Sequence, residues 1–139
     1  MRRILVPVDG SPGSDRAVRH VIDRVRNEGA AEVHLLYVDA ANPARGAPAL
    51  PEPVGPLQRD RQERMTQSGR RLLDEAGVPY ECHFEMGEPS ETIVRHARVH
   101  GCDEIVMGTR GCGTIRTLLP GSVATKVVHL VDRPVTLVP

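Results

Sequence analysis

The sequence is poor in aromatic residues, with one phenylalanine, two tyrosines and no tryptophan among 139 residues. Proteins that bind single-stranded nucleic acid stack bases on aromatic side chains, so this scarcity argues against that function. The chain also lacks a charge excess, because 18 basic residues balance 18 acidic ones. Nucleic-acid-binding domains usually carry surplus basic charge. The composition therefore disfavours nucleic acid as a partner.

Long apolar runs are missing as well. No segment approaches the roughly 20 apolar residues that a membrane-spanning helix needs. The stretch Ile4–Val8 near the N-terminus is too short for the hydrophobic region of a signal peptide, and Asp9 closes it. The three cysteines follow no zinc or disulfide spacing. We therefore expect no membrane partner and a reducing, cytoplasmic location.

Short runs rich in valine, leucine and isoleucine alternate with segments of helical periodicity. Strands are predicted at residues 3–8, 32–38, 80–85, 103–107 and 135–138. Helices are predicted around 17–25, at 57–76, from 88–90 onward and at about 122–131. A proline-rich segment without periodicity, residues 39–56, is predicted to be a long loop.

This alternation predicts an α/β fold, with parallel strands joined by right-handed crossovers and helices on both faces of the sheet. The length suits one domain spanning residues 1–139. Sheets of this kind bind ligands at their carboxyl edge, where the strand order reverses. The loops that follow the first and fourth strands, at Asp9 and Gly108, are therefore the candidate binding loops.

The loop from Gly108 to Ser122 is rich in glycine and joins a buried strand to a helix. Glycines allow close approach of the backbone to a ligand, and the N-terminus of a helix favours phosphate. Arg110 and Arg116 add positive charge nearby. Neither the P-loop motif nor the G-x-G-x-x-G dinucleotide motif is present.

The spacing that remains is Gly108-x2-Gly111-x9-Gly121-Ser122, and here the sequence resembles the ATP-binding branch of the universal stress protein family. The resemblance extends over most of the chain. It includes the segments 4–11, 35–38, 105–108 and 133–138.

The resemblance implies a three-layer sandwich with a five-stranded parallel sheet of strand order 3-2-1-4-5. It also implies a set of nucleotide-binding residues. Four lie near the adenine and ribose, namely Pro7, Val8, Asp9 and Val38. Seven lie near the ribose and phosphates: Met107, Gly108, Gly111, Gly121, Ser122, Val123 and Ala124. Arg110 completes the predicted set because of its positive charge in the glycine loop. Ala124 departs from the family pattern, because many members carry a hydroxyl residue at that position.

These features predict an ATP-binding regulatory protein, with Mg²⁺ bridging the phosphates and no protein ligand assigned to the metal. No residue stands out as a general base, so we assign no catalytic residue and expect slow ATP hydrolysis at most. The family resemblance and the uncharged last strand, residues 135–138, predict a homodimer joined through that strand.

Two other functions remain open. The chain could be a nucleotide-free dimerisation or stress-interaction module whose glycine loop is structural. An ATP-dependent adenylating enzyme of similar topology is a third class, but the loop 9–14 does not match its serine-glycine-glycine-x-aspartate-serine motif.

Several residues have structural interpretations beside these functional ones. Asp9 could close a turn, and Ser122 could cap its helix. His96 and His100 have the i, i+4 spacing of zinc ligands, but without an evident fourth ligand a solvated helix face is expected. His34 and His83 are expected to make local hydrogen bonds within strands.

Overall fold

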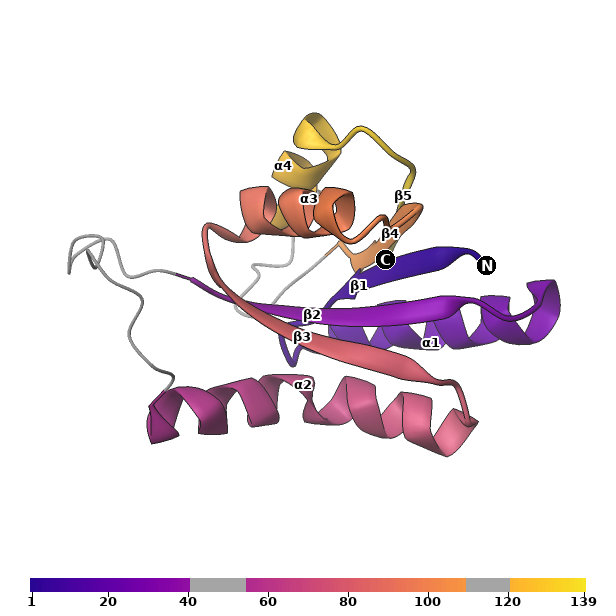
Figure 1. Ribbon diagram of the computed structural model, residues 1–139, viewed down its shortest axis with the longest axis horizontal. Helices are drawn as coiled ribbons and strands as arrows, with labels where there is room; N and C mark the ends of the chain where they lie inside the picture. The colour runs from indigo at the N-terminus through magenta and orange to yellow at the C-terminus, as the bar shows by residue number, and fades with distance from the viewer. Residues whose placement is uncertain (41–54, 110–120) are drawn as a thin grey trace.

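The computed structural model describes residues 1–40, 55–109 and 121–139. Its centre is a five-stranded parallel sheet in the order β3-β2-β1-β4-β5 (Figure 1). The strands are β1 (Arg3–Pro7), β2 (Glu32–Ala40), β3 (Tyr80–Gly87), β4 (Glu104–Gly108) and β5 (Val135–Val138). The helices are α1 (Pro12–Glu28), α2 (Pro56–Ala76), α3 (Pro89–Val99) and α4 (Ser122–Leu130). The predicted α/β class and strand order are confirmed.

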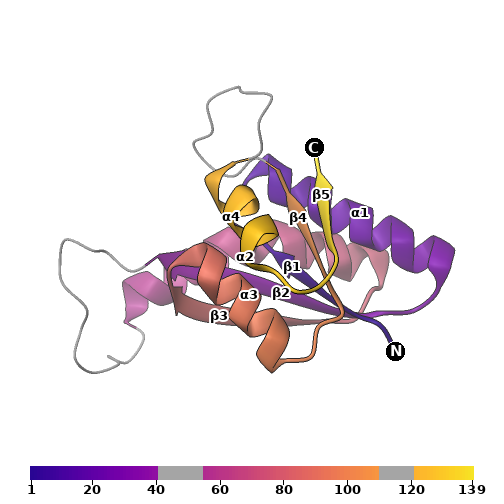
Figure 2. The same cartoon turned by 90° about the horizontal axis from the view of Figure 1, so that it is seen from above.

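The helices form a layer on each face of the sheet. Helices α1 and α2 cover one face, and α3 and α4 lie side by side over the other (Figures 1 and 2). Successive strand residues face opposite layers. In β1, Ile4 and Val6 belong to the core under α1 and α2, while Leu5 belongs to the core under α3 and α4. All three are fully buried, which explains why β1 is a continuous apolar run.

The element boundaries follow recognisable end signals. Ser11 caps α1 by accepting the N–H of Ser14 at 3.2 Å, and Gly77 ends α2 in the left-handed conformation. Helix α3 begins at Pro89 as predicted, with the side chain of Glu88 as its cap. Strands β2 and β3 each extend two residues beyond their predicted ends, because they continue to pair in register as far as Ala40 and Gly87.

Some predictions concern residues that the structure does not describe. Most of the loop predicted at 39–56 lies outside the described residues, as do Arg110, Gly111 and Arg116. In the part of the chain that is described, no helix has the length and apolar character needed to cross a membrane. The cytoplasmic location stays a prediction.

Candidate functional site

A cavity of about 270 Å³ lies at the carboxyl edge of the sheet, between β1, β2, β4 and the first turn of α4. Ten of the twelve residues predicted at the nucleotide line it, and the other two, Arg110 and Gly111, are outside the described residues. The ten are Pro7, Val8, Asp9, Val38, Met107, Gly108, Gly121, Ser122, Val123 and Ala124. Four separate segments of the sequence thus meet at one place.

The loop after β1 is held in shape by a chain of short polar contacts. The Oδ1 atom of Asp9 accepts the N–H of Ser11 at 3.0 Å, so Asp9 does close a turn. The helix cap itself is Ser11, whose hydroxyl accepts the N–H of Ser14, and the Ser14 hydroxyl donates to the carbonyl of Ser11 at 3.0 Å. These bonds fix the loop that places Asp9 on the cavity wall.

Gly108 lets β4 approach the start of α1. A Cβ atom at Gly108 would lie 2.6 Å from the carbonyl oxygen of Gly13 and 2.8 Å from its carbonyl carbon. No real side chain tolerates such contacts with backbone atoms. The glycine is therefore required by packing, whether or not a ligand also approaches it.

The first turn of α4 supplies the polar end of the cavity. Gly121 is the N-cap residue and Ser122 is the first helical residue, so the predicted capping role of Ser122 is wrong. The first N–H groups of a helix have no acceptor within the helix, and the helix dipole places partial positive charge there. The N–H of Gly121 donates to the carbonyl of Thr109, which holds the start of α4 against the end of β4.

Comparison with known proteins agrees with this geometry. The model of the universal stress protein family matches residues 1–139. The chain belongs to the universal stress protein family. A family member from Methanocaldococcus jannaschii is 32% identical over 139 residues, covering 99% of this chain and 81% of the relative. One from Thermus aquaticus is 34% identical over 143 residues, covering 99% of this chain and 98% of the relative.

Solved structures show the same fold. The structure of the M. jannaschii protein MJ0577 superposes with a TM-score of 0.75 at 26% identity, covering 99% of this chain and 94% of that one. A universal stress protein from Archaeoglobus fulgidus gives a TM-score of 0.74 at 22% identity, covering 100% of this chain and 94% of that one.

The cavity of this universal stress protein also includes residues that sequence reasoning missed: Ser11, Ser14, Leu36, Pro89, Ile93 and Thr109. Leu36 could have been found, because it lies two residues before Val38 on the same face of β2. Pro89 and Ile93 come from the first turns of α3, and only the packing of α3 beside α4 brings them to the cavity.

The interior of the cavity is mainly apolar, with Leu36, Val38, Ile93 and Met107 on its walls. Among the described lining residues, Asp9 alone carries a formal charge. The site thus has an apolar part on the sheet and a polar part formed by the loop at Asp9 and the start of α4. This arrangement suits a ligand with an apolar portion and an anionic portion.

Away from the cavity, the histidines of this universal stress protein differ from expectation. His96 is 3% exposed, so the predicted solvated face is wrong for it, although His100 is exposed. His96 faces the sheet beside Ile93 and Ala97, and its Nδ1 atom bonds the carboxylate of Glu85. Burial lowers the pKa of His96 despite this bond. The expected local hydrogen bonding is confirmed for His34, whose Nε2 atom is 3.1 Å from Oε1 of Glu32. Its Nδ1 atom also lies 2.9 Å from Nε2 of His83, a contact between distant segments that the sequence did not predict.

Proposed function

We propose that this chain is a regulatory protein that binds an adenine nucleotide, ATP in particular, and that residues 1–139 act as one nucleotide-binding domain. The observation that carries the proposal is the cavity at the carboxyl ends of β1, β2 and β4. All ten predicted nucleotide-binding residues that the structure describes line this cavity. If the glycine loop served packing alone, there would be no reason for the predicted nucleotide-binding residues of four separate segments to surround one cavity.

Relatives with bound nucleotides support the proposal. Solved universal stress proteins are described in complex with cAMP, with dAMP in the A. fulgidus protein, and with AMP in an Arabidopsis thaliana protein. Their TM-scores to this chain are 0.71, 0.70 and 0.70, at identities of 21%, 22% and 20%. Similarity at these identities establishes a shared fold, whereas the binding of an adenine nucleotide by this chain is our proposal.

The cavity offers each part of a nucleotide a suitable surface. The adenine and ribose would lie against Val38 and Met107, with the Asp9 carboxylate able to accept hydrogen bonds from ribose hydroxyls. The phosphates would lie at the first turn of α4, where the N–H groups and hydroxyl of Ser122 can donate. Ala124 has no hydroxyl to add, so one phosphate hydrogen bond of other family members would be absent.

Mg²⁺ would bridge the phosphates of ATP and neutralise part of their charge. Asp9 supplies the one carboxylate among the described lining residues, and we assign no protein ligand to the ion. No described lining residue is a histidine, lysine or cysteine, side chains that frequently act in proton transfer. We therefore propose that ATP acts as a regulatory ligand that is hydrolysed slowly at most.

Thermal unfolding in the presence of nucleotide tests this proposal. ATP with Mg²⁺ at 100 times its dissociation constant adds about 2.7 kcal/mol of stability, which raises the midpoint by roughly 5–10 °C in a domain of this size. Val38→Phe fills the apolar part of the cavity and should abolish the rise. Val128→Phe is the matched control, because Val128 is 46% exposed on α4 and does not line the cavity. An unchanged midpoint in wild-type protein at millimolar ATP, ADP, AMP and cAMP would overturn the proposal.

The alternative is a nucleotide-free dimerisation or stress-interaction module. One observation favours it, namely that packing against Gly13 alone accounts for the glycine at position 108. Protein purified without added nucleotide and then denatured distinguishes the two functions. A released adenine chromophore supports the nucleotide-binding protein, and its absence together with an unchanged melting midpoint supports the alternative.

We also propose that the chain forms a homodimer through β5. This strand is at the edge of the sheet, and all four of its residues are partly exposed. The carbonyl of Pro134 accepts the N–H of Ile105 in β4, and that of Val138 accepts the N–H of Thr109 just after β4. Because alternate residues of a strand direct their polar backbone groups to opposite sides, those of Val135 and Leu137 point outward. They can pair with the same strand of a second copy.

A further inference from the structure

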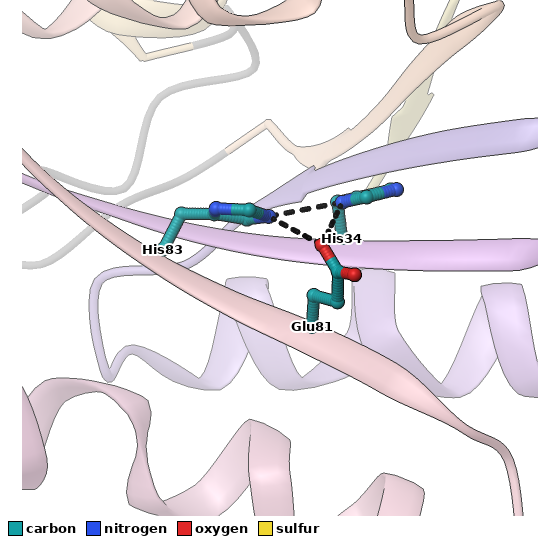
Figure 3. Close-up of side chains that lie close together, drawn as sticks. All are labelled: His34, Glu81 and His83. Atoms are coloured by element: carbon teal, nitrogen blue, oxygen red, sulfur yellow. Dashed lines mark hydrogen bonds and ion pairs between the residues drawn. The ribbon is translucent and has the colours of Figure 1, made fainter. Parts of the chain in front are cut away.

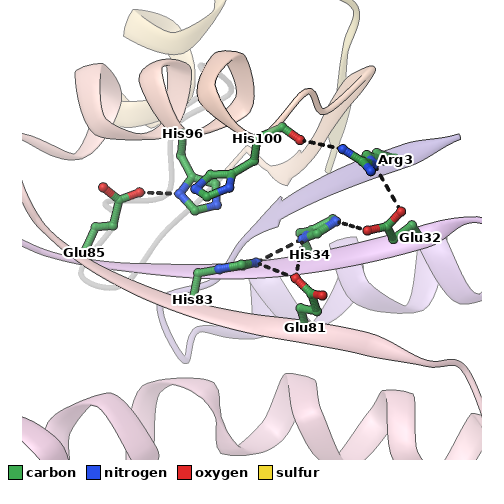
Figure 4. Close-up of polar contacts among 8 residues, drawn as sticks. All are labelled: Arg3, Glu32, His34, Glu81, His83, Glu85, His96 and His100. Carbon is green, nitrogen blue, oxygen red and sulfur yellow. Dashed lines mark hydrogen bonds and ion pairs between the residues drawn. The ribbon is translucent and has the colours of Figure 1, made fainter.

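Four of the six histidines of the chain gather between the sheet and α3 (Figure 4). His34 belongs to β2 and His83 to β3, while His96 is on α3 and His100 follows its last residue. The ring centroids of His34 and His83 are 5.2 Å apart, and those of His83 and His96 are 4.7 Å apart. Such a cluster of imidazoles lies outside the nucleotide cavity and has no part in the proposed nucleotide binding.

We propose that His34, His83 and Glu81 form a binding site for a divalent transition-metal ion, with Zn²⁺ as the best fit (Figure 3). The Nδ1 atom of His34 is 2.9 Å from Nε2 of His83, and each nitrogen is 3.5 Å from Oε2 of Glu81. Ligand atoms of a tetrahedral zinc site are about 3.3 Å apart, given metal–ligand distances near 2.05 Å. The three atoms therefore need to move by only a few tenths of an ångström to hold the ion.

The pairing of β2 with β3 brings these side chains together. His34 is the register partner of Glu81, so the two side chains project from the same face of the sheet. His83 lies two residues after Glu81 and therefore faces the same way. The arrangement is part of the rigid sheet and does not depend on a loop.

A second layer of polar contacts prepares His34 as a ligand. Its Nε2 atom is 3.1 Å from Oε1 of Glu32, and Glu32 accepts a further bond from Arg3 at 3.1 Å. A carboxylate at this position favours the proton on Nε2, which leaves a lone pair on Nδ1, the atom nearest Glu81 and His83. Histidine ligands of metals are oriented by carboxylates in this way. Two imidazoles with one carboxylate form a donor set that suits zinc.

His96, whose ring centroid is 4.7 Å from that of His83, supports the proposal. Its Nδ1 atom is bonded to Glu85, while its Nε2 atom is buried and has no hydrogen-bond partner among the described residues. A buried nitrogen without a partner is costly, and a hydrated cation in the neighbouring cluster would supply one. The Glu81 side chain is 64% exposed, so the ion can enter from solvent and keep a water in its fourth position.

The proposed metal site and the nucleotide cavity are separate. The nearest cavity residue on β2, Leu36, lies two positions after His34, about 7 Å along the strand, and none of the three ligands lines the cavity. Metal binding can therefore be measured without nucleotide. Its failure would leave the proposed nucleotide function untouched.

The test is calorimetric titration of EDTA-treated, tag-free full-length protein with Zn²⁺, supported by the visible absorption of bound Co²⁺. Wild type should bind one ion per chain and give the intense spectrum of tetrahedral Co²⁺. Glu81→Gln removes a ligand at an exposed position and should weaken binding at least tenfold. Glu32→Gln should weaken it about 10- to 100-fold through the orientation of His34. His83→Gln should abolish stoichiometric binding.

His129→Gln is the matched control, because His129 is exposed on α4 and outside the cluster. It should bind Zn²⁺ like wild type. A wild type that binds no stoichiometric Zn²⁺ would overturn the proposal. Unchanged affinity in both Glu81→Gln and His83→Gln would also overturn it, because the ion would then be held elsewhere.

Discussion

Replacing glycine by alanine is predicted to destabilise the protein at Gly108, where β4 packs against α1, and to stabilise it at Gly69 in α2. In Gly108→Ala the new Cβ would meet the carbonyl oxygen of Gly13 at 2.6 Å. An unstrained C···O contact is about 3.3 Å or longer, so the backbone of β4 or α1 must move by about 0.7 Å. Overpacking of this kind costs about 1–3 kcal/mol, which lowers the melting midpoint by roughly 4–12 °C in a chain of this length.

Gly69→Ala provides the contrast. Gly69 is buried within α2, but its added Cβ would lie 3.5 Å from Val18, 3.6 Å from Leu35 and 3.7 Å from Val8, which are ordinary contacts. Replacing a glycine inside a helix by alanine stabilises by about 0.5–1 kcal/mol. Urea unfolding of both variants with wild type measures the difference. Equal stability of Gly108→Ala and wild type would refute the argument that close packing requires this glycine.

Two further predictions concern α3 and β5. Glu88→Ala removes the carboxylate that accepts the N–H of Glu91 at 2.8 Å, and should cost about 1 kcal/mol of stability. This bond lowers the pKa of Glu88. Its stabilisation is therefore fully present above the ordinary glutamate pKa of about 4.3 and is lost as the pH falls below it, through the lowered pKa of Glu88 in the folded protein. The difference between variant and wild type in urea unfolding should accordingly disappear in acid, and a difference that persists there would contradict the assignment. Leu137→Lys should convert the proposed dimer to monomers in light scattering at low micromolar concentration, whereas Val99→Lys, at a 71% exposed position of α3, should not. A monomeric wild type would exclude the β5 interface.

The sheet and most of the cavity could be predicted because their signals are local. Buried parallel strands are continuous apolar runs such as Ile4–Val8, and the topology brings their carboxyl ends together. The family resemblance supplied the strand order and the individual nucleotide residues. The start of α4 at Ser122 was predicted correctly, but its cap was not, because Gly121 and Ser122 are both acceptable cap residues.

The histidine cluster could not be predicted because it depends on packing between distant segments. His34 and His83 are 49 residues apart in sequence and meet only through the β2–β3 register. His96 was predicted to lie on a solvated helix face, but its burial depends on which side of α3 faces the sheet and on the partner Glu85. Sequence periodicity does not reveal such a partner.

Methyl NMR of the protein titrated with ATP and Mg²⁺ tests the central claim most directly, because it reports both binding and its location. The methyl signals of Val38, Met107 and Val123, which line the cavity, should shift and saturate together. Those of Val25 on α1 and Leu72 on α2, which pack against the core on the opposite face of the sheet, should not move. Saturable shifts confined to the cavity methyl groups are the result we predict. Unchanged cavity signals at millimolar ATP, or saturable shifts on the opposite face alone, would contradict it.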